Sequence, residues 1–413
     1  MTRRIDLMKS SGRWHHLQVR FDPYSEQCRR DPYPVYQALR DRDPAHFDEE
    51  RGFWALSRFA DVVTALHDPE TFRSGEGIVL EGQPRTSYPM IIAMDPPRHS
   101  QLRALVARAF TARTIAAIGP AIRRLARELI DGFASAGTVE LVGAFSGALP
   151  LLVIAELLGV EREGLGEFRR LADLVLAQDP ADPSSLEAGG AGSLALLEGM
   201  RRIVNQRRDS PRDDLISALV AAAIDGERLD EEEILGFCYL LILAGSETTT
   251  NLIANGVLAL AAHPDQRSEL AADSTLLPDA IEEVLRWDSP VQSQARTTSR
   301  PVEIHGRTIP AGSKVLILFG SAGRDEREYA RAEQFDIRRR IDRHLTFGHG
   351  IHFCLGASLA RLEAQIAFEE LLRRIPNWRI DCEPRELERV RPYMVRGPAR
   401  LPLVFTPADE RRA

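Results

Sequence analysis

The sequence predicts a mainly α-helical protein with small β-sheets, folded as one large domain over residues 1–413. Along most of the chain apolar residues recur at helical rather than alternating spacing, and strand-like runs are few and short. The chain has 413 residues, of which 44% are hydrophobic, so it can bury a sizeable core. It contains neither an internal repeat nor a low-complexity tract, either of which would favour another architecture.

Helices are predicted where apolar positions keep the helical period: 32–41, 96–110, 121–135, 215–225, 231–263, 278–287 and 355–375. Strands are predicted where short runs are rich in β-branched and aromatic residues: 52–57, 295–319 and 401–406. The Pro-, Gly- and Ser-rich stretch 177–193 lies between helical patterns, and we expect a mobile loop there.

The composition excludes several classes of protein. A net charge of -7 argues against nucleic acid as a partner. The most apolar stretch, 141–155, contains Pro150 and is too short to span a bilayer, so we read it as core and expect no membrane partner. The four cysteines form no CxxC pair and no secretory signal precedes them, which favours a reducing cytoplasm and no disulfides. We also expect a monomer.

One cysteine stands in an unusual setting, the stretch "FGHGIHFCLG" at 347–356. Cys354 precedes a predicted helix, where free backbone N–H groups and the helix dipole favour a thiolate. The surrounding glycines let the backbone turn tightly and approach a flat group closely. From the residues alone, two alternatives stay open. The thiol can be a small buried hydrophobe, or it can bind zinc or iron together with His349 and His352.

This stretch resembles the haem-binding loop of the cytochrome P-450 family. The residues at the family's spacing are Phe347, Gly348, His352, Cys354 and Gly356. Four further matches follow the family's order: "DPPRHSQLR" (95–103), "AGSETT" (244–249), "EEVLR" (282–286) and "FDIRR" (335–339). Their joint occurrence covers nearly the whole chain and is highly specific.

The resemblance implies haem b (iron protoporphyrin IX) as the cofactor. Cys354 would be the proximal axial ligand of the iron, with Phe347, Gly348, Gly356 and Ala244 beside the macrocycle. The two haem propionates need cations, and the resemblance assigns that task to His99, Arg103, Arg296 and His352.

The apolar run "GFCYLLILAG" is followed by an acid and an alcohol, Glu247 and Thr248. A threonine inside a helix can hydrogen-bond to a carbonyl one turn earlier and loosen the ladder enough to admit water. An ordinary polar helix end is the alternative, but the apolar run "LIANGVLALAA" continues beyond it. By resemblance Glu247 and Thr248 are the catalytic, oxygen-activating pair, and they would relay protons.

Glu283 and Arg286 are spaced i, i+3, which by itself is typical of a surface ion pair. The resemblance makes them a buried structural scaffold joined by Arg339, although residues 338–340 offer three arginines for that part.

By analogy with the family, the substrate pocket takes residues from 78–92, 291–293, 394–397 and the central helix. The residues we assign to it are Leu240, Leu243, Ala244, Val291, Gln292 and Val395. Such a surface is mostly apolar and suits a small lipophilic substrate. Arg396 could bind a carboxylate or serve the structure alone.

Together these features predict a bacterial-type haem-thiolate monooxygenase, an oxidoreductase that uses O2 as co-substrate. Because the chain shows no reductase domain, NAD(P)H would act only indirectly, through a separate ferredoxin or flavodoxin with its reductase. Arg98, Arg108, Arg113 and Arg361 are the candidate docking residues for that carrier. A haem-thiolate peroxygenase or isomerase and a non-catalytic haem sensor are the alternatives.

Overall fold

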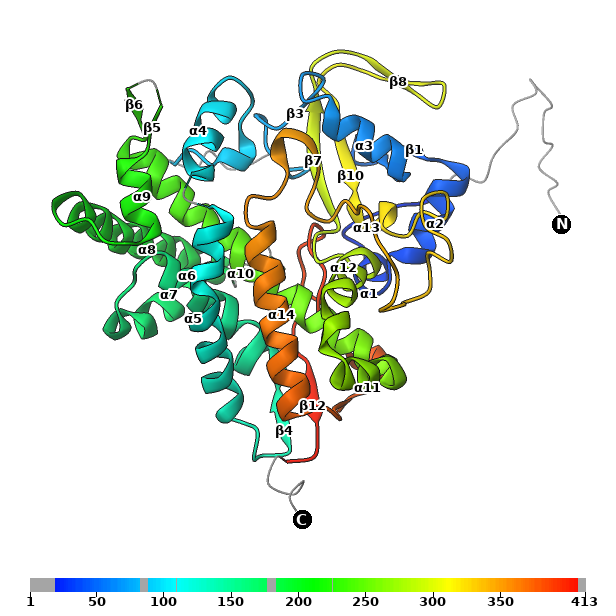
Figure 1. Ribbon diagram of the computed structural model, residues 1–413. Helices are drawn as coiled ribbons and strands as arrows, with labels where there is room; N and C mark the ends of the chain where they lie inside the picture. Colours follow the sequence, from blue (N-terminus) through cyan, green and yellow to red (C-terminus); the bar gives the residue numbers. More distant parts are fainter. Residues whose placement is uncertain (1–18, 82–87, 109, 177–182, 225, 408–413) are drawn as a thin grey trace, which may run out of the picture.

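The computed structural model describes residues 19–81, 88–108, 110–176, 183–224 and 226–407. The helices are α1 (Glu26–Arg30), α2 (Tyr33–Arg42), α3 (Phe59–His67), α4 (Arg98–Ala107), α5 (Ala112–Asp131), α6 (Ala148–Leu157), α7 (Leu165–Leu176), α8 (Pro183–Asp209), α9 (Leu215–Ala221), α10 (Glu231–Ala262), α11 (Pro264–Ala272), α12 (Leu277–Trp287), α13 (Phe319–Ala322) and α14 (Ala357–Arg374). The strands are β1 (Ala45–Asp48), β2 (Phe53–Leu56), β3 (Phe72–Arg73), β4 (Thr138–Glu140), β5 (Ala223–Ile224), β6 (Glu227–Arg228), β7 (Ser293–Thr298), β8 (Val302–Ile304), β9 (Arg307–Ile309), β10 (Lys314–Leu318), β11 (Arg379–Ile380) and β12 (Pro402–Val404). The prediction of a mainly α protein with small sheets is confirmed (Figure 1).

The central helix α10 organises the helical half of the molecule. It begins with a capping box, in which the Asp230 side chain accepts from the Glu233 N–H and the Glu233 side chain accepts from the Asp230 N–H. Its middle is buried on most sides, as its nearly continuous apolar sequence predicts. It packs against α6, α8, α12 and α14, so side chains from all these helices meet around it.

The main sheet lies beside the helical half and has the strand order β1-β2-β10-β7-β3. β2 and β10 are parallel, and the other pairs are antiparallel. Side chains alternate across it, so Phe53 and Leu316 join a core cluster with α2 whereas Trp54 and Val315 join another with α3. Because both faces are covered, β7 is held firmly and can carry side chains toward α10.

Most predicted elements are present, with shifted ends. The predicted strand segment 295–319 is divided among β7, β8, β9 and β10. The predicted helix 121–135 begins earlier, at Ala112, after Thr111 caps it by accepting from the Thr114 N–H. The stretch 141–155 is buried core in a π-helical turn and α6, as predicted.

The prediction of a mobile loop over 177–193 was wrong for residues 183–193. Residues 177–182 lie outside the described residues, whereas 183–193 are the first turns of α8. Gly192 serves close packing of helices there, because a Cβ at this position would lie 3.2 Å from the Leu171 carbonyl oxygen on α7. The composition of this stretch indicated a loop, but packing against α7 stabilises the helix despite the low helix propensity of glycine.

Within the described part of the chain, no helix combines the length and the apolar character needed to cross a membrane.

This packing predicts opposite effects for two neighbouring glycines of α8. A Cβ on Gly190 would meet nothing within 4 Å, so Gly190→Ala should raise the free energy of unfolding by ~0.5–1 kcal/mol through helix propensity. Gly192→Val should lower it by ~1–3 kcal/mol by forcing α7 and α8 apart. Chemical denaturation of both variants measures this difference. A neutral Gly190→Ala would argue against helix at this position.

Candidate active site

An apolar cavity of about 220 Å³ lies between α10, β7 and the loop 347–356. Every residue assigned to the cofactor from the sequence lines it: Cys354, His99, Arg103, Arg296, His352, Phe347, Gly348, Gly356 and Ala244. Leu240, Val291 and Thr248 line it as well. Residues more than 250 positions apart in the sequence are therefore gathered around one space.

The loop that carries Cys354 is held by its own backbone and by α3. The Cys354 N–H donates to the Phe347 carbonyl at 2.8 Å, which closes the loop. Gly348 and Gly350 have positive φ angles of 69° and 68°. A Cβ on Gly350 would lie 2.5 Å from the Leu66 carbonyl oxygen, so only glycine permits this approach to α3.

The protonation of Cys354 differs from the sequence expectation. Burial raises the pKa of its thiol, and this outweighs the backbone hydrogen bond at Gly356 and the charges of Arg103 and Arg361, which lower it. The backbone hydrogen bond at Gly356 favours the thiolate, as predicted from the helix terminus, but burial of the sulfur opposes it. A bound metal cation would be needed to hold this sulfur as a thiolate.

Cationic and imidazole groups meet at one end of the cavity with too few partners. Both ring nitrogens of His99 are buried and have no hydrogen-bond partner, and its ring lies 4.1 Å from that of His352. Burial lowers the pKa of Arg296 to about 10, only partly offset by Asp95. Burial and the neighbouring cations lower the pKa of His352 to about 3. Asp95 offsets only part of this positive charge, so a group bearing carboxylates fits the cluster.

Arg103 contributes to this site through the backbone of the cysteine loop. Its guanidinium donates to the carbonyl of Phe353, the residue before Cys354. Burial lowers the pKa of Arg103, as expected for a guanidinium that faces the cavity without a carboxylate.

The acid and the alcohol of α10 occupy different positions relative to the cavity. Thr248 lines it, and its hydroxyl donates to the Ala244 carbonyl at 2.6 Å. Thr249 also lines it, whereas Thr250 donates to the Ser246 carbonyl at 2.8 Å and lies outside the lining. Glu247 is not in the lining either. Its carboxyl is largely buried, and burial raises its pKa to about 7.

Glu283 and Arg286 form a fully buried, bidentate ion pair with distances of 2.7 and 2.8 Å. Of the three arginines at 338–340, Arg339 joins them by donating to Glu283 at 3.2 Å. Arg338 pairs with Glu269 and Arg340 with Asp279 instead.

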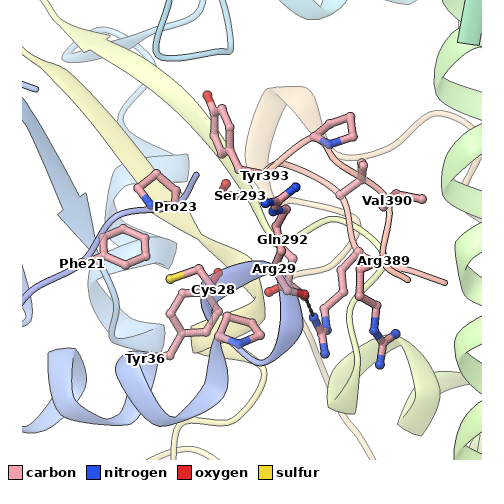
Figure 2. A pocket seen from close by; sticks show the side chains of 14 residues that line it. Phe21, Pro23, Cys28, Arg29, Tyr36, Gln292, Ser293, Arg389, Val390 and Tyr393 are labelled. Atoms are coloured by element: carbon pink, nitrogen blue, oxygen red, sulfur yellow. Dashed lines mark hydrogen bonds between the residues drawn. The ribbon is translucent and has the colours of Figure 1, made fainter. Parts of the chain in front are cut away.

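Three residues assigned to the substrate pocket lie elsewhere in the described structure. Leu243 packs against the helical core and does not line the cavity. Gln292 and Val395 line a separate small pocket near α1 and α2 (Figure 2). Gln292 turns away because its amide donates to the Ser289 carbonyl.

The remaining parts of that assignment are mixed. Residues 82–87 of the predicted segment 78–92 lie outside the described residues, while Ile91 and Ile92 line the cavity. Arg396 is structural, because it pairs with Asp288 at 2.8 Å and donates to two backbone carbonyls. Lining residues that sequence reasoning missed include Phe110, Phe237, Gln294, Phe319 and Glu363. These residues carry no distinctive sequence signal, and their positions follow from packing.

Comparison with known proteins agrees with this site. The family model for cytochrome P-450 matches residues 194–383. The chain is 40% identical to the cytochrome P-450 monooxygenase PikC of Streptomyces venezuelae, over 90% of this chain and 91% of that protein. It is 39% identical to the vitamin D(3) 25-hydroxylase of Pseudonocardia autotrophica, over 94% and 96% of the two chains.

The fold agrees as well. The structure of cytochrome P-450 CYP109Q5 from Chondromyces apiculatus superposes with a TM-score of 0.87 at 39% identity, over 94% of this chain and 98% of that one. This chain belongs to the cytochrome P-450 family. Membership implies a haem cofactor and the use of O2.

The buried carboxyl of Glu247 predicts a pH-dependent stability. Because its folded pKa of about 7 lies above its ordinary value of 4.5, its contribution is fully present below pH ~4.5 and is lost as the pH rises to about 7. Glu247→Gln should remove this loss, which is worth about 3 kcal/mol at most. Unfolding midpoints of the haem-loaded protein between pH 5 and 8 measure it. Glu128→Gln, on the exposed side of α5, should keep the wild-type pH dependence.

Proposed function

We propose that this protein is a haem-thiolate monooxygenase that inserts one oxygen atom from O2 into a small lipophilic substrate by hydroxylation or epoxidation. The observation that carries the proposal is the meeting of Cys354 with an anion-deficient cluster of His99, Arg296 and His352 around one apolar cavity. PikC is named a monooxygenase and the Pseudonocardia relative a hydroxylase, which supports this reaction class.

The described residues fit haem b. Cys354 Sγ would bind the iron, and His99, Arg103, Arg296 and His352 would take the two carboxylates, which supplies the partners that the cluster lacks. When bound, haem supplies the reductive activation of O2. The chain itself supplies the ligand, the counter-charges and a largely apolar cavity.

Glu247 and Thr248 would handle protons at this site. With a pKa near neutrality, the Glu247 carboxyl can hold a proton and release it again under ordinary conditions. The Thr248 hydroxyl donates to the Ala244 carbonyl, so its oxygen is free to accept a hydrogen bond from water in the cavity. The pair would thus take protons from within the protein to the cavity.

The substrate would be a small, uncharged lipophilic molecule. The ionisable lining residues in the described chain come from α4, β7, the loop 347–356 and α14, whereas Phe110, Phe237 and Leu240 make another part of the wall apolar. Gln294 offers one polar contact on β7. The name of the Pseudonocardia relative, a vitamin D(3) 25-hydroxylase, agrees with a lipophilic substrate.

Electrons would come from an acidic ferredoxin or flavodoxin with its reductase. Phe353, beside Cys354, is 40% exposed and gives such a carrier an apolar contact near the sulfur. Of the arginines expected to dock the carrier, Arg98 and Arg361 already pair with glutamates. Arg108 and Arg113 are exposed and remain the stronger candidates for a salt-sensitive interface.

The first test concerns the iron ligand. Cys354→Ala should abolish the strongly red-shifted Soret band of the reduced carbonyl complex, because among common haem ligands only a cysteine thiolate gives it. The matched controls are Cys28→Ala, Cys238→Ala and Cys382→Ala, which should keep the band. Loss of the band in a control instead of Cys354→Ala would overturn the assignment of the ligand.

The second test concerns the proton pair. Thr248→Ala should bind haem and substrate normally while the product formed per NAD(P)H oxidised falls by about 10-fold or more, because protons no longer reach the right oxygen. Thr250→Ala removes the same kind of back-bonded hydroxyl outside the cavity and should stay coupled. Equal coupling in both variants would remove Thr248 from this role. A haem sensor would show no substrate-dependent NAD(P)H oxidation at all.

A further inference from the structure

The loop that carries Cys354 is tied to α12 by a second carboxylate, one residue before the buried Glu283. Glu282 accepts two hydrogen bonds from Arg361 of α14, from Nε at 2.6 Å and from Nη2 at 2.8 Å. Its Oε2 also lies 3.0 Å from Nε2 of His344. One carboxylate thus joins α12, α14 and the chain that enters the cysteine loop.

The backbone decides how His344 takes part. Its Nδ1 accepts from the Thr346 N–H at 3.3 Å, so the proton of the neutral ring must sit on Nε2 and point at Glu282. The Thr346 hydroxyl donates to the Leu285 carbonyl of α12 at 2.6 Å. The entry to the loop is therefore fixed to α12 at two successive points.

Arg361 carries the connection from Glu282 to the sulfur. Its guanidinium lies over the ring of Phe347, 4.5 Å from the ring centre. The carbonyl of the same Phe347 accepts the hydrogen bond from the Cys354 N–H at 2.8 Å. Contacts thus run without a gap from Glu282 through Arg361 and Phe347 to the residue that bears the thiol.

We propose that Glu282, Arg361 and His344 form a clamp that positions the Cys354 loop and keeps the sulfur in place as the iron ligand. This inference rests on the proposed function, since it concerns the ligand of the haem. The three are positioning residues, because they act through Phe347 and the loop backbone.

The same helix provides a comparison with an ordinary surface ion pair. Asp279, three residues before Glu282, meets Arg340, whose side chain is 82% exposed, through a contact at 2.8 Å. Pairs of that kind contribute little. Glu282 is about as exposed as Asp279, but its partners Arg361 and His344 are much less exposed than Arg340, and together they give it three donors. Burial raises its pKa, but the hydrogen bonds from Arg361 and His344 lower it to about 2, so the carboxylate stays charged at neutral pH.

The experiment measures how long the thiolate ligand survives in the haem-loaded protein. The reduced carbonyl complex is held at a fixed raised temperature, and the loss of the red-shifted Soret band is followed together with far-UV circular dichroism. Glu282→Gln and Arg361→Gln should each lose the band about 10-fold faster than the wild type, while the helical signal is retained. Asp279→Asn should behave as the wild type.

Two further variants test whether the residues act as one unit. The double variant should also be about 10-fold faster rather than about 100-fold, because each single change already opens the same connection. Arg361→Lys keeps the charge but loses the fork that spans Glu282 and Phe347, so it should fall between wild type and Arg361→Gln. If a glutamine variant fails to fold, the rate at which Arg361→Lys loses the band tests the clamp instead.

The outcomes separate the two proposals. The clamp would be overturned if the Glu282 and Arg361 variants lost the Soret band at the wild-type rate. It would also be overturned if the double variant lost the band about 100-fold faster, or if the band disappeared only after the helical signal had been lost. A wild-type protein that never shows the red-shifted band would instead overturn the proposed function.

Discussion

The position of the cysteine loop depends on a charge pair that is fully removed from water. Glu283 and Arg286 are both 0% exposed, and an isolated charge in such a place costs several kcal/mol. Further hydrogen bonds offset this desolvation cost. Arg286 donates to the carbonyls of Gly323 and Ala332, and Glu283 accepts from the Asp336 backbone N–H. Each of these bonds fixes a piece of irregular chain against α12. The segment that then leads into residues 347–356 therefore starts from a defined place.

The cavity differs from this ion pair, because several of its buried polar groups lack hydrogen-bond partners or counter-charges. His99 has two buried nitrogens without partners, and burial lowers the pKa of Arg296 to about 10. Such groups destabilise the protein until an anion reaches them. Burial likewise favours the neutral thiol of Cys354 until a cation binds the sulfur. A haem bears both the carboxylates and the cation, so its binding and the stability of the fold would be coupled.

The elements that the sequence predicted well are those whose pattern is set by burial on one side or on all sides. The helices at 231–263 and 278–287 appear within a residue of their expected ends, because the first is a long apolar run and the second has a regular one-sided apolar pattern. The prediction of a loop over 183–193 was wrong because a glycine can either interrupt a helix or allow a second helix to approach closely. Only the contact of Gly192 with α7 distinguishes these two cases.

At the site, the sequence by itself determined which residue types would be needed and, through the spacing of five motifs, which residues supply most of them. The thiol, the four residues that the family resemblance assigns to the propionates, Thr248 and the Glu283–Arg286 pair all belong to short local motifs, and the residues of the first three groups line the cavity. Tertiary structure alone decided that Gln292 and Val395 leave the cavity, that Arg339 rather than its neighbours meets Glu283, and that Glu282 reaches Arg361. The physical reason is that side-chain direction depends on packing between distant segments, which periodicity along one segment does not record.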